Sequence, residues 1–278
     1  MKTHAFLPIA TYPETIGEAA LGNAVEIAAK IGASLRVVAI KADIPDVSNA
    51  LSKFLLDTPQ LIRDAETKSR IEGDRLAHFV EDKANAIGVE VSAGSVTAPI
   101  AALADVAAVH ARYLDLSLVP VEYSNETSRM MAEVVVFGSG RPVLLVPDRL
   151  KPSAFDHVAI AWDGSRAAAR AVADARAFLE RAKRISVLTV YDEKPIKEKD
   201  AGERLAAALR ESGLPAQALV LDSEDCPIAE TLQLGALEHN ANLLVMGGYG
   251  HSRLRDFVLG GATTGVLADL RLPVLLSH

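Results

Sequence analysis

The most informative residues of this sequence are four glycines in the segment 247–264, which together could bind a phosphate group. They are Gly247, Gly250, Gly260 and Gly261. Glycine lets the backbone turn sharply and approach a ligand where a Cβ atom would collide with it. The second pair begins a segment that can form a helix, and the free N–H groups and dipole of a helix N-terminus favour an anion. The spacing therefore predicts a phosphate cradle of main-chain donors. Two ordinary surface turns are the alternative, because glycine patterns recur by chance.

Two side chains near these glycines could take part in binding. Asp163 ends an apolar strand and precedes Gly-Ser, so it could contact a ligand, cap the following helix, or do both. His251 follows Gly250 directly and could reach a phosphate group or face water. Ser165 is better placed to cap a helix than to act as a nucleophile, because no Gly-x-Ser-x-Gly motif surrounds it.

The sequence contains no motif for catalysis or for a metal site built by protein ligands. It has no Gly-x4-Gly-Lys-Ser/Thr segment, so it lacks the lysine that P-loop proteins use in phosphoryl transfer. Its seven histidines show neither His-x-x-His nor His-Glu-x-x-His spacing. We therefore predict no catalytic residue and no metal-ligating residue.

The two halves of the chain repeat the same order of elements. Pro-Val-Leu-Leu closes both, at residues 142–145 and 273–276, and Ala98-Pro-Ile-Ala101 is matched by Cys226-Pro-Ile-Ala229. In each half, apolar strands alternate with helical segments as β-α-β-α-β-α-β-α-β. This alternation is typical of parallel strands joined by right-handed crossovers, with helices on both faces of the sheet.

We therefore predict an α/β protein of two tandem doubly wound domains, residues 1–149 and 150–278, each with a mainly parallel five-stranded sheet. The first domain carries an inserted segment, residues 44–65, whose apolar spacing permits one or two amphipathic helices. These helices could pack in the core or between the halves, or could form a lid or a partner surface. We expect the final strands, residues 143–146 and 274–277, to pair about a pseudo-twofold axis, because open strand edges seek partners. A homodimer of whole chains is also compatible with such edges.

The first half has lost the glycines of the cradle. The chain advances 28 residues from Val245 to Pro273 but only 23 from Val119 to Pro142. A β-branched or long side chain cannot present bare backbone to a phosphate group, so we predict a single cradle, in the second half. The residues that stand where the second half has glycine are Val121, Ser124, Arg129 and Met130.

Composition and charge exclude several classes of function. The net charge is −7, with 29 basic and 36 acidic residues, which argues against nucleic acid as a general partner. The sequence has neither an apolar run long enough to span a membrane nor the apolar stretch of a secretory signal near Met1. The single cysteine, Cys226, cannot form an internal disulfide. These features predict a cytoplasmic protein without a membrane partner.

The second half resembles the universal stress protein family. The family's ATP-binding signature is Gly-x2-Gly-x9-Gly followed by Ser or Thr, and Gly247, Gly250 and Gly260 keep this spacing. The segment 158–165 resembles the family's first strand and its Asp-Gly-Ser turn. The first half is similar only in its order of elements and its closing Pro-Val-Leu-Leu. The resemblance implies two tandem flavodoxin-like domains and an adenine nucleotide at the carboxyl ends of the strands, where ligands bind open α/β sheets.

The resemblance also implies a role for each site residue. Asp163 would contact the adenosine portion, and Val190 would meet the adenine through its backbone. Gly247 and Gly250 would lie along the ribose and phosphates. Any Mg²⁺ would bind only through the phosphate oxygens, because this ion prefers phosphate and water to a protein cage.

The phosphate tail would be held at the end of the glycine-rich segment, by Gly260, Gly261 and the main-chain N–H groups of Ala262 and Thr263. Gly261 departs from the family, which has Ser or Thr there. The lost hydroxyl is worth about 1.5–3 kcal/mol if it bonded a charged phosphate. We therefore expect weaker binding rather than none, and the natural ligand could be ATP or another adenine nucleotide.

These observations favour a nucleotide-binding regulatory protein of the stress response, in which the glycine loop orders around phosphate and changes a surface for an unidentified protein partner. One alternative is an interaction scaffold of the same fold that binds no nucleotide. A third hypothesis is a weak ATPase acting through Asp163 and His251.

Overall fold

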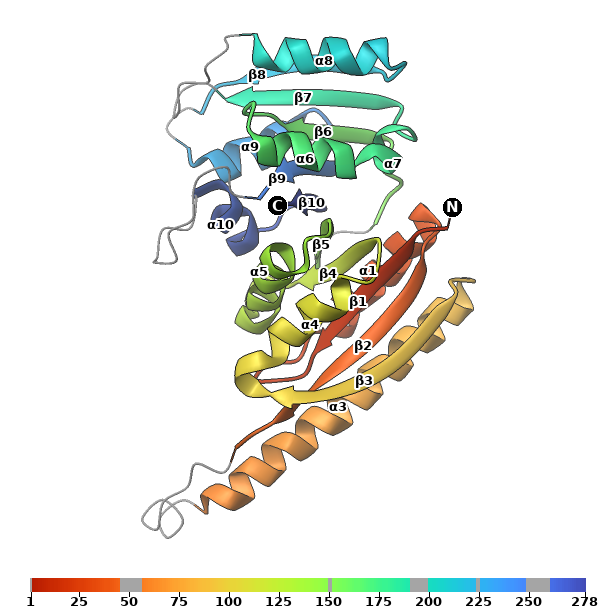
Figure 1. Ribbon diagram of the computed structural model, residues 1–278, viewed down its shortest axis with the longest axis vertical. Coiled ribbons are helices and arrows are strands. Elements are labelled where there is room, and N and C mark those ends of the chain that lie inside the picture. The colour runs from red at the N-terminus through yellow and green to blue at the C-terminus, as the bar shows by residue number, and fades with distance from the viewer. Residues whose placement is uncertain (1, 46–56, 150–151, 191–199, 224–225, 249–260) are drawn as a thin grey trace. The chain divides into compact units, whose positions relative to one another are not determined.

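The computed structural model describes residues 2–45, 57–149, 152–190, 200–223, 226–248 and 261–278 (Figure 1). The chain divides into two compact units, Met1–Ser139 and Gly140–His278. Both units alternate strands and helices around mainly parallel strands, which confirms the predicted α/β class. Among the described residues, no helix is both long and apolar enough to cross a membrane.

Unit 1 contains four parallel strands in the order β3-β2-β1-β4. Its elements in chain order are β1 (His4–Ala10), α1 (Glu18–Ile31), β2 (Ser34–Asp43), α3 (Thr58–Ala86), β3 (Val91–Pro99), the 3-10 turn η1 (Ile100–Ala102), α4 (Leu103–Ala111), β4 (Leu116–Val121) and α5 (Glu126–Ser139). Successive side chains of a strand point to opposite faces. In β2, Ala39 contacts α3 while Ile40 faces α4, so these two helices cover opposite faces of the sheet.

Unit 2 contains five parallel strands in the order β10-β9-β6-β7-β8, as predicted for a doubly wound domain (Figure 1). Its elements in chain order are β5 (Val143–Pro147), β6 (His157–Ala161), α6 (Arg166–Asp174), α7 (Arg176–Leu179), β7 (Arg184–Val190), α8 (Ala201–Glu211), β8 (Ala216–Leu221), α9 (Ile228–Glu238), β9 (Leu243–Gly247), α10 (Gly261–Ala268) and β10 (Val274–Ser277). The central strands are buried along their length, which explains why they appear in the sequence as unbroken apolar runs.

Strand β5 lies in unit 2 although it ends the first sequence repeat. It pairs antiparallel with β10, and Leu144 stands opposite Leu275. This is the pairing of final strands that the sequence predicts. By its contacts, the chain divides into units after Ser139. The domain boundary predicted from the sequence, at residue 149, stays a prediction.

The inserted segment 44–65 is described only in part. Residues 46–56, which include Leu51, Phe54 and Leu55, lie outside the described residues. From Thr58 the segment forms the first turns of α3, a helix of 29 residues. Leu61 is 58% exposed, so this apolar side chain does not belong to the core of unit 1. A lid or partner surface therefore stays a prediction for this segment.

His157, the first residue of β6, should make the stability of unit 2 depend on pH. Its Nε2 lies 2.8 Å from Oγ of Ser186, and burial, with a further contribution from the charge of Arg184, lowers its pKa. The unfolded chain therefore takes up a proton at a higher pH than the folded chain does. We expect the free energy of unfolding to fall as pH drops below about 6.5, and His157→Gln to reduce this slope. Urea unfolding between pH 7 and pH 5 measures it, and an unchanged slope would contradict the assignment.

The β5–β10 pairing predicts an energetic coupling between two leucines. Leu144 and Leu275 are fully buried and directly opposite, so each change to Ala should cost about 2–5 kcal/mol of unfolding free energy. A double-mutant cycle should show a coupling of about 0.5–3 kcal/mol, because the two side chains share one cross-strand contact. Leu144→Ala combined with Leu76→Ala in α3 serves as the control and should be additive. A coupling no larger than that of the control would contradict the pairing.

Candidate functional site

The candidate site lies where the strand order of unit 2 reverses. From β6 the chain runs outward through β7 and β8, then returns to place β9 and β10 on the other side of β6. The connections that leave β6 and β9 therefore run to opposite sides, and in open α/β sheets ligands bind at the carboxyl ends of strands at such a reversal. Asp163 follows the end of β6, and Gly247 is the last residue of β9. Because β6 and β9 are adjacent parallel strands, the two predicted residues lie at the same edge of the sheet.

Asp163 belongs to a tight turn that also caps α6. Its Oδ1 accepts a hydrogen bond of 2.9 Å from the main-chain N–H of Ser165. Gly164 has a φ of +74°, which glycine adopts without strain. Oγ of Ser165 accepts a hydrogen bond from the N–H of Ala168, which confirms that Ser165 caps the helix. The carboxylate of Asp163 is exposed and can accept further bonds, so capping the turn leaves it able to contact a ligand.

Val190 is the last residue of β7, the strand next to β6. The two strands pair from His157 with Arg184 to Ala161 with Leu188, so Val190 and Asp163 both lie just beyond this pairing, at the carboxyl edge of the sheet. Val190 is half-buried. The structure thus brings Asp163, Val190 and Gly247 to one edge, although they lie far apart in the sequence.

Gly247 is required by packing before any ligand is considered. A Cβ atom on this residue would lie 2.5 Å from the carbonyl carbon of Ala167 and from the main-chain N of Ala168 in α6. The following residue, Gly248, is held by β10, because its N–H donates to the carbonyl oxygen of Ser277 over 2.7 Å. The end of β9 is therefore fixed by backbone contacts on both sides.

Gly261 is the first described residue of α10. Among the described residues, no atom would lie within 4 Å of a Cβ on Gly261, in contrast to Gly247. Ala262 and Thr263 follow in the helix, and Thr263 is only 3% exposed. That the N–H groups at the start of this helix bind an anion stays a prediction.

Three predicted residues cannot be placed. Gly250, His251 and Gly260 lie outside the described residues. In the part of the chain that the structure covers, no group of three or more His, Cys, Asp or Glu side chains is arranged to hold a metal ion.

The sequence of this region matches a known family. A sequence model of the universal stress protein family matches residues 154–278, which comprise β6 to β10 and every predicted site residue. Residues 154–278 are therefore similar in sequence to the universal stress protein family. No curated protein sequence matches the chain.

Solved universal stress proteins share the fold of both halves. One from Archaeoglobus fulgidus DSM 4304 is 16% identical, with a TM-score of 0.69, over 98% of this chain and 97% of its own. A putative universal stress protein from Pseudomonas aeruginosa UCBPP-PA14 is also 16% identical, with a TM-score of 0.55, over 99% of this chain and 93% of its own. At this identity the likeness concerns the fold. The likeness extends over nearly the full chain. Unit 1 therefore has the fold of these structures too, although the family's sequence model does not match it.

In unit 1 the N-termini of α5 and α1 are occupied by carboxylates of the protein itself. The N–H of Glu126, at the start of α5, donates to Oε2 of Glu14 over 3.1 Å. The N–H of Gly17, at the start of α1, donates to Oε1 of Glu122 over 2.9 Å. Asn125 adds a third bond, because its Oδ1 accepts from the N–H of Ser128. A phosphate group would have to displace these acceptors and would meet their negative charge.

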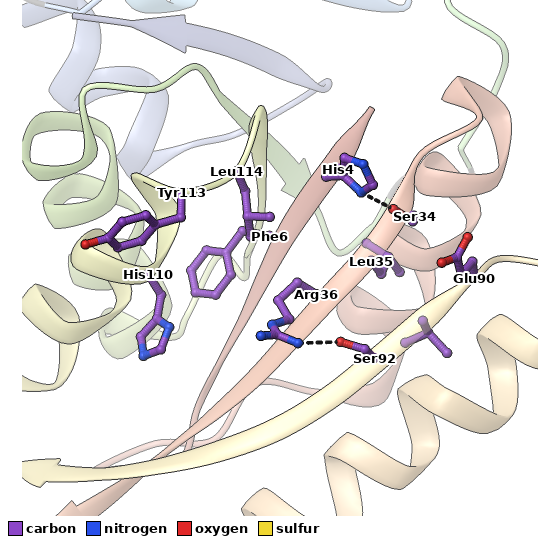
Figure 2. A pocket seen from close by; sticks show the side chains of 11 residues that line it. His4, Phe6, Ser34, Leu35, Arg36, Glu90, Ser92, His110, Tyr113 and Leu114 are labelled. Atoms are coloured by element: carbon purple, nitrogen blue, oxygen red, sulfur yellow. Dashed lines mark hydrogen bonds between the residues drawn. The ribbon is translucent and has the colours of Figure 1, made fainter. Parts of the chain in front are cut away.

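A cavity of about 450 Å³ lies away from every predicted site residue, at the amino ends of β1, β2 and β3 (Figure 2). Figure 2 shows Arg36 donating to Oγ of Ser92 over 2.9 Å and His4 beside Ser34, with 2.8 Å between Nδ1 and Oγ. The sequence does not reveal this cavity, because it depends on the register of three strands. Its polar groups bond one another, and it lies at the edge opposite to the one where α/β sheets bind ligands.

The contrast between Gly247 and Gly261 predicts opposite effects of the same substitution. Gly247→Ala should lower the free energy of unfolding of unit 2 by about 1–3 kcal/mol, since its Cβ would meet backbone atoms that cannot rotate away. Gly261→Ala should have no effect or stabilise by up to about 1 kcal/mol, because alanine favours a helix and meets nothing. Urea unfolding of the ligand-free protein, followed by fluorescence of the single tryptophan, Trp162, measures both. Equal effects of the two changes would contradict the packing role of Gly247.

Proposed function

We propose that residues 154–278 bind an adenine nucleotide, ATP or a close relative, at the carboxyl ends of β6 and β9. The observation that carries the proposal is the meeting of Asp163, Val190, Gly247 and the first turn of α10 at one end of the unit 2 strands. Their types match the parts of a nucleotide: an exposed carboxylate for hydroxyl and amino groups, backbone at a strand end for a base, and helix N–H groups for phosphate.

In this proposal each group binds without performing chemistry. Asp163 accepts hydrogen bonds from the ribose, and the backbone of Val190 meets the adenine. Gly247 and Gly250 line the ribose and phosphates, and Gly260, Gly261, Ala262 and Thr263 hold the phosphate tail beside His251. Mg²⁺, if bound, is held by the phosphate oxygens and water.

We further propose that the role of binding is regulatory. The segment between β9 and α10 would order around the nucleotide and so change a surface for a protein partner. A cytoplasmic location and a function in the stress response belong to this proposal. If no adenine nucleotide binds, the interaction scaffold remains as the hypothesis for this fold.

The proposal predicts that Gly261→Ser tightens nucleotide binding. A serine hydroxyl at the start of α10 can donate to a phosphate oxygen, a bond worth about 1.5–3 kcal/mol, which corresponds to roughly tenfold to hundredfold in Kd. Asp163→Ala should weaken binding, because the ribose loses its acceptor. Calorimetric titration of the full chain with ATP and Mg²⁺ measures both, and quenching of Trp162 beside Asp163 gives an independent readout.

The control is Ser124→Ala in unit 1, which should leave the affinity unchanged. No heat and no thermal shift with millimolar ATP in both wild type and Gly261→Ser would remove the nucleotide from the account. An equal loss of affinity in Ser124→Ala and Asp163→Ala would place the ligand outside the proposed site.

A further inference from the structure

Three residues of unit 1 occupy the positions that the nucleotide site uses in unit 2. The register of β1 and β2 starts with His4 opposite Ser34 and six residues later places Ala10 opposite Ile40. The same step from His157 and Arg184 leads to Asp163 and Val190. Ala10 and Ile40 are therefore the counterparts of these two residues. The third counterpart is Met130, which the alignment of the two halves places at Gly261.

These three counterparts meet in one cavity. It has a volume of about 270 Å³ and lies between the carboxyl ends of β1 and β2 and the helices α4 and α5. Ile40 is fully buried at its base, and Met130 is 47% exposed at its mouth. The remaining lining is also mainly apolar: Tyr12, Pro13, Ile100, Ala101, Leu103, Ala104, Thr127 and Met131. Unit 1 therefore has a cavity at the carboxyl ends of its strands, and the lining of this cavity is mainly apolar.

The cavity offers nothing to an anion. None of its lining residues carries a charge, and the hydroxyl of Thr127 already accepts a bond from the N–H of Glu14. The neighbouring hydroxyl of Thr11 donates to the carbonyl oxygen of Ile40. Glu14 and Glu122 hold the nearby helix N-termini, as described above. A phosphate or carboxylate would lose its hydration here and gain no cation in return.

We propose that this cavity binds a small uncharged molecule with an apolar body about the size of two fused rings. An apolar cavity of roughly 150 Å³ takes up benzene, so the larger volume here suits a second ring. Met130 and Met131 suit such a ligand, because the thioether side chain adapts its shape and contacts aromatic rings favourably. Unit 1 would thus sense an apolar compound at the position where unit 2 would bind a nucleotide.

A side chain from a second protein is the competing occupant. Among the lining residues, the large apolar side chains with an exposed surface are Ile100 and Met130. A standard protein interface uses about 20–30 residues on each side. So small an apolar rim around a hollow fits a small molecule better than a protein. The inference is independent of the nucleotide proposal, because all the lining residues belong to unit 1.

Methyl NMR of the full chain with labelled methionine tests the proposal, with indole as the probe. The chain has four methionines, and two of them, Met130 and Met131, line the cavity. Indole should shift and saturate the Met130 and Met131 methyl signals and leave Met246 unchanged, because Met246 is buried in β9 of unit 2. Indole-3-carboxylate should bind at least about tenfold more weakly, since a carboxylate would be desolvated there.

Met130→Glu should weaken indole binding at least about tenfold by placing a charge at the mouth, whereas Met130→Leu should retain it. Circular dichroism and the thermal midpoint confirm that both variants fold. Four results would overturn the proposal: no saturable shift up to the solubility limit of indole, an equal shift at Met246, equal affinity for indole-3-carboxylate, or equal affinity in Met130→Glu. A dimer of the full chain that Met130→Glu dissociates, with no indole binding in either protein, would assign the cavity to a second copy of the chain.

Discussion

The helix N-termini beside the carboxyl ends of the strands need acceptors, and the proposed difference between the two halves depends on which acceptors they have. A helix N-terminus carries main-chain donors and a partial positive charge that must be satisfied by some acceptor. In unit 1 the acceptors are carboxylates of the chain, Glu14 at α5 and Glu122 at α1. In unit 2, the start of α6 has two acceptors: the carboxylate of Asp163 accepts from the N–H of Ser165, and the hydroxyl of Ser165 accepts from the N–H of Ala168. The proposed anion site of unit 2 therefore depends on α10 rather than on α6.

The two halves share one order of strands and helices, and they differ in the side chains at the carboxyl ends of the strands. Both have a parallel strand pair that ends at this edge, with Ala10 opposite Ile40 in unit 1, and with Asp163 and Val190 after the paired residues of β6 and β7 in unit 2. Where unit 2 has a carboxylate and bare backbone, unit 1 has a methyl group and a thioether. Ala10 and Met130 both line the apolar cavity of unit 1.

Much of this organisation could be predicted from the sequence, because it follows from local patterns. Apolar runs and short motifs predict four features: the alternation of strands and helices, the tandem repeat, the cap at Ser165 and the pairing of the final strands. The packing role of Gly247 could not be predicted, because it depends on how closely α6 approaches β9. The bond from Glu126 to Glu14 joins residues 112 positions apart and left no local pattern. The same holds for the cavity of unit 1 and for the assignment of β5 to unit 2.

The number of adenine nucleotides that one chain binds is the most direct test of this account. Native mass spectrometry of the full chain with ATP and Mg²⁺ measures it, for wild type and for a variant with Glu14→Gln and Glu122→Gln. The account predicts one nucleotide per wild-type chain, retained in the variant because the occupied site lies in unit 2. Two nucleotides per wild-type chain, or a single one lost in the variant, would show that the carboxylates of unit 1 do not exclude phosphate and would contradict it.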